Sequence, residues 1–274
     1  MPIIESVSVA AVAVPLDKVT SFSTRTVSER HYCLVKVRGK DGNEGIGFCY
    51  VGSAGGDIAK IAVEQLLAPK LIGQNSHRSE GLWMDMYNES ILQGRAGAVM
   101  RGISILDTAL WDLNARAAKL PLHQYLGSVV DDRVPAYASG GYYLDGKTPA
   151  MLGKEMESYV KKGFKAVKMK VGRLSPREEE ARVKAARKAV GEDVLLTLDA
   201  NNAWRDLPTA LEYVRRFEAY NPYWIEEPFS PDAIDLHAAL ARQTKINVAT
   251  GEMEAGRWRF RELIEAGGVA ILQS

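Results

Sequence analysis

Apolar and polar residues alternate at the start of the chain, and this pattern changes along its length. Residues 3–9 have the period of two that is typical of a half-buried strand. Residues 32–37 and 45–50 are also strand-like, and the Asp-Gly pair between them, within residues 40–43, is a strong hairpin signal. Helical periodicity then predicts three helices, at residues 58–71, 79–92 and 100–119. Strands followed by a run of helices indicate an α+β domain, which we assign to residues 1–130.

From residue 131 onward, short apolar runs alternate with amphipathic helical stretches. The runs begin at intervals of 23 to 30 residues, near Val134, Phe164, Val194, Tyr223, Ile246 and Val269. A repeating βα unit predicts a parallel sheet covered by helices, and both an open doubly wound sheet and a closed barrel fit this alternation. A Gly-x-Gly-x-x-Gly turn follows none of the runs, which weakens the nucleotide-binding alternative. We therefore predict a (β/α) TIM-type barrel over residues 131–274, incomplete because the chain ends in its sixth strand.

Acidic residues follow three successive predicted strands at corresponding positions. Asp199, Glu226 and Glu252 are separated by 27 and 26 residues, one βα unit each. Barrel enzymes place their catalytic groups at the carboxyl ends of the strands. A single acid at such a position is more often a helix cap, but three in order would repel one another unless a cation lay among them. Because the ligands would all be oxygens, the pattern favours a hard ion such as Mg²⁺.

Two lysines end the strand before these acids. Lys168 and Lys170 are two residues apart, so their side chains point to the same face of the strand. Beside a metal site they would face a bound anion. We expect the proximity of the second lysine and the metal to lower the lysine pKa, which would make such a lysine a usable base.

The composition excludes several classes of protein. Of the 274 residues, 46% are hydrophobic and 25% are charged, as in folded globular proteins. The 35 basic and 34 acidic residues give a net charge of +1, without the basic excess of a nucleic-acid-binding protein. Apolar stretches stay below the roughly 18 residues that span a bilayer, and no basic residue precedes Lys18 as in a signal peptide. We expect neither a nucleic-acid partner nor a membrane partner.

The two cysteines, Cys33 and Cys49, are too few for a disulfide scaffold and fit a cytoplasmic location. If Asp41 and Gly42 form the hairpin turn, the two cysteines lie nearly opposite each other on neighbouring strands. We expect free thiols that pack as small apolar groups.

The segments that carry these charged residues resemble one known family. They are Ala166-Val167-Lys168-Met169-Lys170-Val171-Gly172, Asp199-Ala200-Asn201, Trp224-Ile225-Glu226-Glu227-Pro228 and Thr250-Gly251-Glu252. Together they resemble the enolase superfamily, in particular the mandelate racemase branch of the mandelate racemase / muconate lactonizing enzyme family. Residues 107–113 and 121–127 are also similar to the segments that lead into the family's barrel, so the resemblance covers essentially the whole chain. It implies that the N-terminal domain is a cap that closes over the barrel mouth and helps to select the substrate.

The resemblance also implies roles for individual residues. The implied Mg²⁺ ligands are Asp199, Glu226 and Glu252. Lys170 is the implied base and Lys168 its partner, which helps to neutralise the substrate carboxylate, while Asn201 matches a substrate-contacting position. A glutamate rather than an aspartate at position 252 favours the mandelate racemase branch over the muconate lactonizing branch. Glu227, out of phase with Glu226, should point away from the ion.

The chemistry implied by the resemblance is removal of the proton α to a carboxylate, to give an enediolate. Dehydration of an acid sugar is the preferred outcome on family frequency, and racemisation or epimerisation of a 2-hydroxy acid is the alternative. A protein of another class, a non-catalytic binding protein that retains the fold, is a further alternative. We expect a small-molecule carboxylate as substrate and a homo-oligomeric assembly.

The chain departs from the family pattern at its C-terminus. It stops at residues 271–274, within the sixth strand, whereas family members continue with an Asp after strand six and a His after strand seven. The four histidines of the chain do not follow barrel strands and are expected to be ordinary surface or packing residues; they are His31, His77, His123 and His237. We expect the protein to be longer than this chain.

Overall fold

The computed structural model describes residues 2–127 and 133–274, which form two compact units. The first unit contains residues 1–18 and 27–134, and the second contains residues 19–26 and 135–274. The predicted boundary between residues 130 and 131 falls outside the described residues. Within the described ranges, the structure contains no helix with both the length and the apolar character needed to cross a membrane.

The first unit contains a sheet in the order β1 (Ile4–Ser21), β2 (Thr26–Gly39) and β3 (Glu44–Tyr50). Strands β2 and β3 are antiparallel and form the predicted hairpin, with Cys33 directly opposite Cys49. Gly42 in its turn has a φ of 82°, a left-handed conformation that glycine adopts without steric cost. The two cysteines lie opposite each other on neighbouring strands and are free thiols, and both predictions are confirmed. Strand β1 is longer than the predicted strand at residues 3–9.

Helices follow this sheet; the third of them packs against β3, and the other three contact that helix. The helices are α1 (Gly56–Ala62), α2 (Ser79–Glu89), α3 (Gly97–Ala117) and α4 (Leu122–Leu126). Helix α1 continues through a π turn (Val63–Leu67) and a 3-10 turn (Ala68–Lys70), so the predicted helix at 58–71 is three consecutive helical segments. Helix α3 approaches β3 so closely that a Cβ added at Gly47 would lie 2.1 Å from the carbonyl oxygen of Ile105. The glycine is therefore required by the packing of α3.

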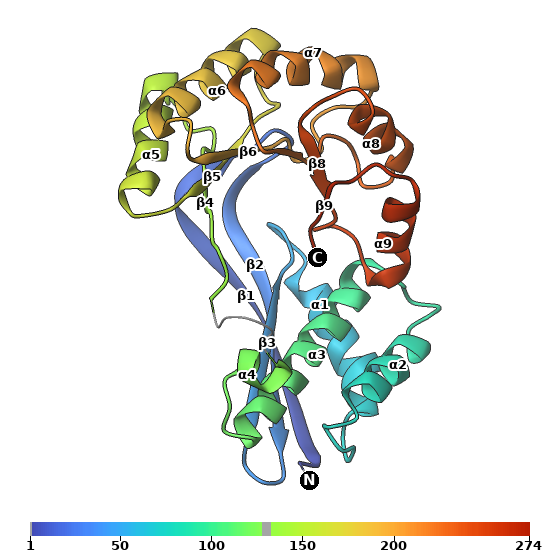
Figure 1. Ribbon diagram of the computed structural model, residues 1–274. Helices are drawn as coiled ribbons and strands as arrows, with labels where there is room; N and C mark the ends of the chain where they lie inside the picture. Colours follow the sequence, from blue (N-terminus) through green and yellow to red (C-terminus); the bar gives the residue numbers. More distant parts are fainter. Residues whose placement is uncertain (1, 128–132) are drawn as a thin grey trace. The chain divides into compact units, whose positions relative to one another are not determined.

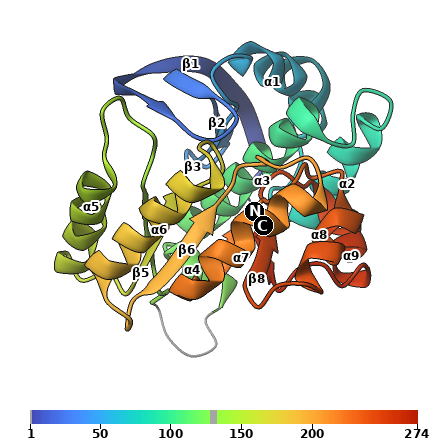
Figure 2. The ribbon, with the colours of Figure 1, turned by 90° about the horizontal axis from the view of Figure 1, so that it is seen from above.

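The second unit alternates strands and helices as predicted. Its strands are β4 (Ala138–Gly140), β5 (Ala166–Lys170), β6 (Leu195–Asp199), β7 (Trp224–Glu226), β8 (Asn247–Thr250) and β9 (Ile271–Leu272). Its helices are α5 (Pro149–Lys161), α6 (Pro176–Val190), α7 (Leu207–Phe217), α8 (Ile234–Ala241) and α9 (Gly256–Glu265), with a 3-10 turn at Glu218–Tyr220. Within the described residues the strands form one parallel sheet in sequential order, β4 to β9. Figures 1 and 2 show the curved row of helices α5 to α9 along one side of this sheet. The predicted fold class is confirmed.

Local signals start helices α5, α6 and α7 of this unit. Thr148 accepts a hydrogen bond from the Met151 amide at the start of α5, and Asp206 accepts one from the Thr209 amide at the start of α7. Helix α6 begins with a capping box between Ser175 and Glu178, in which the Ser175 amide donates to Oε2 of Glu178 over 3.0 Å. Each of these helices also has proline in its first turn, where the missing amide hydrogen costs nothing.

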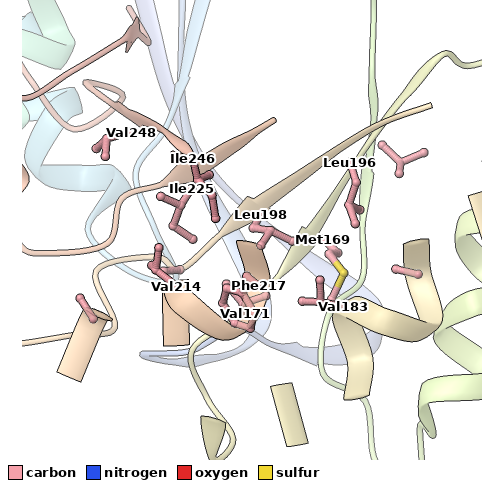
Figure 3. Packing of buried hydrophobic residues seen from close by; sticks show 14 of the residues in the cluster. Met169, Val171, Val183, Leu196, Leu198, Val214, Phe217, Ile225, Ile246 and Val248 are labelled. Atoms are coloured by element: carbon pink, nitrogen blue, oxygen red, sulfur yellow. The ribbon is translucent and has the colours of Figure 1, made fainter. Parts of the chain in front are cut away.

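Alternation along β5 and β6 separates the core from the charged face. Met169, Leu196 and Leu198 are buried against the helices, where Val183 of α6 and Phe217 of α7 complete the core (Figure 3). Because neighbouring side chains on a strand point to opposite faces, the intervening charged residues lie on the face away from the helices. The predicted alternation of apolar and polar residues thus places the candidate site on the face of the sheet away from the helices.

Candidate active site

Three predicted site residues occupy one row across the sheet. Lys170 lies opposite Asp199, and Asp199 lies opposite Glu226, on the parallel strands β5, β6 and β7. Lys168 lies two residues earlier on β5 and therefore faces the same side. All four side chains are buried, and Lys168 and Lys170 are each only 7% exposed. The structure therefore brings both predicted lysines together with two of the three predicted carboxylates.

Positive and negative groups alternate within this cluster. Lys168 donates to both carboxylate oxygens of Glu226, with Nζ–O distances of 2.7 and 2.9 Å, and its Nζ lies 3.4 Å from Oδ2 of Asp199. Lys170 Nζ lies 2.5 Å from the same Oδ2. The indole nitrogen of Trp224 donates to Glu226 over 3.1 Å. These charge-assisted hydrogen bonds offset the cost of burying four ionised groups.

Burial and charge act in opposite directions on the pKa of Lys168. Burial lowers the pKa of Lys168, but the negative charges of Asp199 and Glu226 outweigh burial and hold this pKa above its ordinary value. The expected lowering of the lysine pKa assumed a metal ion beside the lysines, and it stays a prediction. Burial raises the pKa of Glu226, and the charge of Asp199 raises it further while Lys168 opposes the shift.

Glu252 lies apart from the other two predicted ligands. It occupies a turn directly after β8, and its side chain is exposed. Across residues 2–127 and 133–274, no three His, Cys, Asp or Glu side chains are grouped closely enough to hold a metal ion. The expected convergence of three carboxylates is therefore not observed, since Asp199 and Glu226 pair with lysines while Glu252 is solvated. Glu252 is nevertheless close enough for its charge to raise the pKa of Glu227.

Glu227 is a candidate residue whose importance the sequence analysis missed. Its side chain is 2% exposed, and its backbone has a φ of 43°, which is uncommon outside glycine and stores strain. Its Oε1 atom is buried without a hydrogen-bond partner in the described part of the chain. Burial raises the pKa of Glu227 to about 7, and the charges of Glu252, Asp199 and Glu226 act in the same direction. Glu227 thus belongs to the electrostatic cluster, although strand phase alone places it on the opposite face.

Asn201 lies beside the charged row. Its backbone amide donates to Oδ1 of Asp199 over 3.0 Å, and its φ of 46° directs the chain sharply away from the end of β6. Its own Oδ1 is buried, with no hydrogen-bond partner among the described residues. A buried acceptor without a partner is unusual and requires an explanation, such as a ligand or a water molecule.

Aromatic rings surround the two lysines within the second unit. Lys170 Nζ lies 5.4 Å from the ring centre of Tyr142 and 5.8 Å from that of Phe22. Lys168 Nζ lies 5.5 Å from the ring centre of Tyr137. These distances allow cation–π attraction. The sequence analysis missed these rings because Phe22 is remote in sequence and neither tyrosine belongs to a charged motif.

The donor atoms of this site fit a hard divalent cation. The carboxylates of Asp199, Glu226 and Glu252 supply only oxygen, the ligand type that Mg²⁺ prefers. The unpartnered buried oxygens of Glu227 and Asn201 add acceptor capacity beside them. The residues that are present are therefore compatible with Mg²⁺.

A parallel β/α sheet with buried lysines and carboxylates at its strand ends, joined to an α+β unit, defines an enolase-type protein. Residues 4–127 match the family model described as "Mandelate racemase / muconate lactonizing enzyme, N-terminal domain". Residues 151–274 match the model described as "Enolase C-terminal domain-like". The chain belongs to the mandelate racemase / muconate lactonizing enzyme family, as the sequence motifs predicted.

Named relatives of the chain act on acid sugars. It is 39% identical over 218 residues to arabinonate dehydratase of Saccharolobus solfataricus, a match that covers 80% of this chain and 58% of that protein. It is 31% identical over 270 residues to 3,6-anhydro-alpha-L-galactonate cycloisomerase of Streptomyces coelicolor, covering 98% of this chain and 73% of that protein. The chain thus spans less than two thirds of the arabinonate dehydratase.

Solved structures of relatives have the same fold. A racemase from Streptomyces coelicolor A3(2) with bound magnesium superimposes with a TM-score of 0.92 at 31% identity, covering 97% of this chain and 74% of that one. L-talarate/galactarate dehydratase from Salmonella typhimurium LT2, liganded with Mg and L-lyxarohydroxamate, gives a TM-score of 0.91 at 30% identity, covering 98% and 70%.

Proposed function

We propose that this protein is a Mg²⁺-dependent enzyme that removes the proton α to a carboxylate, and that it dehydrates an acid sugar. The observation that carries the proposal is the buried cluster of Lys168, Lys170, Asp199 and Glu226 on the sheet face opposite the helices. A proton α to a carboxylate is weakly acidic, so its removal needs both a base and stabilisation of the developing negative charge. The cluster contains groups for both tasks.

The proposed metal ligands are Asp199, Glu226 and Glu252. Support comes from their oxygen-only donor set and from the magnesium in the structures of two relatives. When bound, Mg²⁺ supplies positive charge that stabilises the negative charge developing on the substrate carboxylate. The side chain of Glu252 must turn inward from its exposed position for this role, and the charge of the ion offers the electrostatic reason for it to do so.

The two lysines are assigned different tasks. Lys168 donates two hydrogen bonds to Glu226, lies deeper along β5, and is suited to remain a fixed cation that attracts the substrate carboxylate. Lys170 lies at the end of β5, where its Nζ can take the proton from the α carbon once that nitrogen is in its amine form. Asn201 is the proposed substrate-binding residue, because its buried Oδ1 can accept a hydrogen bond from a sugar hydroxyl.

Dehydration is preferred to racemisation because named relatives include dehydratases of arabinonate and of talarate and galactarate. Racemisation is the second candidate, favoured by the likeness to the racemase structure from Streptomyces coelicolor. Both reactions share the first step, so loss of the α proton from the substrate tests them together. The fate of the β-hydroxyl then separates them.

The test incubates the full-length protein with Mg²⁺ and a panel of acid sugars in D₂O. NMR should show loss of the α proton from the substrate and a 2-keto-3-deoxy acid that carries solvent deuterium at C3. The Lys170→Met variant should no longer remove the α proton while keeping the fold, whereas Lys184→Met, which changes an exposed lysine of α6, should still remove it. If a panel acid binds but its α proton neither exchanges nor is lost to product, the enzyme proposal is overturned in favour of a non-catalytic binding protein.

We also propose a cytoplasmic location and a homo-oligomeric assembly. The two free thiols support the first, because they suit a reducing compartment. Apolar side chains exposed on β3 of the first unit, Ile46 and Phe48, support the second, since such side chains are commonly covered by a partner. Cell fractionation tests the location, and light scattering coupled to size-exclusion chromatography tests the assembly.

A further inference from the structure

A buried arginine on helix α6 contacts the backbone of the proposed base from the far side of the sheet. Arg182 donates through Nη1 to the carbonyl oxygen of Lys170 over 3.0 Å, and through Nη2 to the carbonyl oxygen of Gly141 over 2.8 Å. Its side chain is almost completely buried. One planar guanidinium therefore joins the end of β5 to the residue that follows β4, a geometry that an ammonium group cannot reproduce.

A second buried residue fixes this arginine. Glu179, one turn earlier on α6, accepts from Arg182 over 2.9 Å through Oε2. Its Oε1 accepts from three successive backbone amides of the turn after β5, at 3.1, 3.0 and 3.0 Å; they belong to Gly172, Arg173 and Leu174. The hydroxyl of Tyr143 also donates to Oε1, and the Tyr143 ring lies 3.9 Å from Cζ of Arg182. The guanidinium is thus held by a carboxylate and by an aromatic face.

We propose that Arg182 is a positioning residue for Lys170, an inference that rests on the proposed function. The carbonyl that Arg182 binds belongs to the same residue as the reacting Nζ, so the backbone of Lys170 is held from the helix side while its side chain extends to the other side. The chain around Gly141 is equally constrained, because a Cβ there would lie 2.5 Å from Cβ of Met169. A misplacement of about 1 Å at a reacting group can reduce the rate by about 100-fold.

Helix α6 contains a matched control. Arg187 is also buried, and its guanidinium donates only to backbone carbonyls, over 2.7 to 3.0 Å; they belong to Tyr220, Gly191, Val194 and Asn221. It contacts the entry of β6, at the opposite end of the strands from Lys170. Arg182→Met and Arg187→Met therefore remove the same type of buried contact at opposite ends of the sheet.

The experiment compares the two variants in the full-length protein, with rates expressed per folded molecule on an acid that the parent turns over. Arg182→Met should lower kcat by about 100-fold and change KM by less than about threefold. Arg182→Lys should fall between the parent and Arg182→Met, and Arg187→Met should keep kcat within about twofold of the parent. Equal loss of kcat in both methionine variants would mean a purely structural role and would overturn the proposal.

Two further measurements cover the remaining outcomes. If Arg182→Met does not fold, Tyr143→Phe removes only the hydroxyl that donates to Glu179, and an unchanged kcat in that variant would overturn the proposal.

Amide hydrogen exchange tests the backbone contact without any substrate. The Val171 amide, which donates to the Asp199 carbonyl over 2.9 Å, should exchange faster in Arg182→Met or Tyr143→Phe but not in Arg187→Met. Unchanged exchange at Val171 in these variants would refute positioning. Faster exchange in the variants, together with a parent that turns over none of the acids, would refute only the proposed function.

Discussion

Lys170 and Asp199 lie directly opposite each other on neighbouring parallel strands, with the lysine Nζ 2.5 Å from Oδ2 of the aspartate. Both side chains are buried on the face of the sheet away from the helices. The in-register pairing of β5 with β6 produces this contact, because equivalent residues on parallel strands point the same way. A proposed base and a proposed metal ligand are therefore neighbours before any substrate binds.

Replacing Asp199 should weaken both metal binding and the stability of the fold. Asp199→Asn keeps the shape of the side chain but removes the charge that pairs with Lys170. We expect Mg²⁺ affinity to fall by more than about tenfold, since loss of even an outer-shell contact costs that much. The free energy of unfolding should fall by about 3 kcal/mol, because a buried lysine loses its partner. Titration calorimetry with MgCl₂ and urea unfolding measure the two effects.

The control for this prediction is Asp193→Asn. Asp193 is an exposed acid shortly before β6, so its replacement should alter neither quantity by more than the experimental error. Unchanged Mg²⁺ affinity in Asp199→Asn would remove this residue from the ligand set.

Replacing glycine with alanine should change the stability of the fold in opposite directions at two positions of the first unit. Gly47→Ala places a methyl group 2.1 Å from the Ile105 carbonyl oxygen, where backbone cannot move cheaply, so it should destabilise by about 3 kcal/mol. Gly81 is inside α2, and its nearest neighbour is the flexible end of Arg78 at 3.3 Å, so Gly81→Ala should stabilise by about 0.5–1 kcal/mol. Urea unfolding followed by circular dichroism should show shifts of opposite sign. A Gly47→Ala variant as stable as the parent would contradict the packing of α3 on β3.

Much of the fold could be predicted from the sequence because the second unit obeys one strict period. Apolar Val167 and Met169 alternate with Lys168 and Lys170, so the core face and the charged face follow from spacing alone. The repeat of βα units then fixed the order of the strands. Strand β1 was underestimated because exposed apolar residues such as Val12 interrupt its alternation.

The candidate site was less predictable because two of its acids follow the ends of their strands. Glu227 has a positive φ, and local sequence does not reveal that its side chain is buried where the charges of Asp199 and Glu226 raise its pKa. Glu252 follows Gly251, whose φ of 133° also departs from strand geometry, and it is exposed. Beyond the last residue of a strand, the alternation of side chains between the two faces of the sheet no longer predicts where a side chain points. The contact of Arg182 with the Lys170 carbonyl was invisible for a different reason, since it joins a helix to backbone.

The thiols of the first unit should react slowly in the folded protein. Burial raises the pKa of Cys33 to about 11, and the neighbouring Cys49 raises it further, so almost no thiolate is present near neutral pH. Burial also raises the pKa of Cys49. At pH 7.5, iodoacetamide should label Cys33 at least about 100-fold more slowly than in urea-unfolded protein, because the thiolate is the nucleophile. Mass spectrometry of digested samples measures the rates, and fast labelling of folded Cys33 would contradict its burial.

The buried histidine of α8 should make the stability of the fold depend on pH. His237 is fully buried, and its Nδ1 lies 2.8 Å from the Ala233 carbonyl oxygen. Burial lowers its pKa below the ordinary value, so the folded protein resists protonation of this ring. Below about pH 6.5 the unfolded chain takes up a proton that folded His237 does not. The stability contributed by the neutral ring is therefore complete above pH 6.5 and is lost as the pH falls towards and through the folded pKa.

This loss should amount to at most about 1.4 kcal/mol per pH unit in that window, the limit for one proton. His237→Gln removes the titrating group, so its free energy of unfolding should be lower at pH 8 but should depend less on pH between about 7 and 5. His123→Gln replaces an exposed histidine and should retain the pH dependence of the parent. Urea unfolding at half-unit pH intervals measures the slopes. The ring of His237 is buried against Phe229, with 5.4 Å between their ring centres, and this burial opposes protonation in the folded protein. Equal slopes for the parent and His237→Gln would contradict the prediction, because they would show that His237 is protonated as readily in the folded protein as in the unfolded chain.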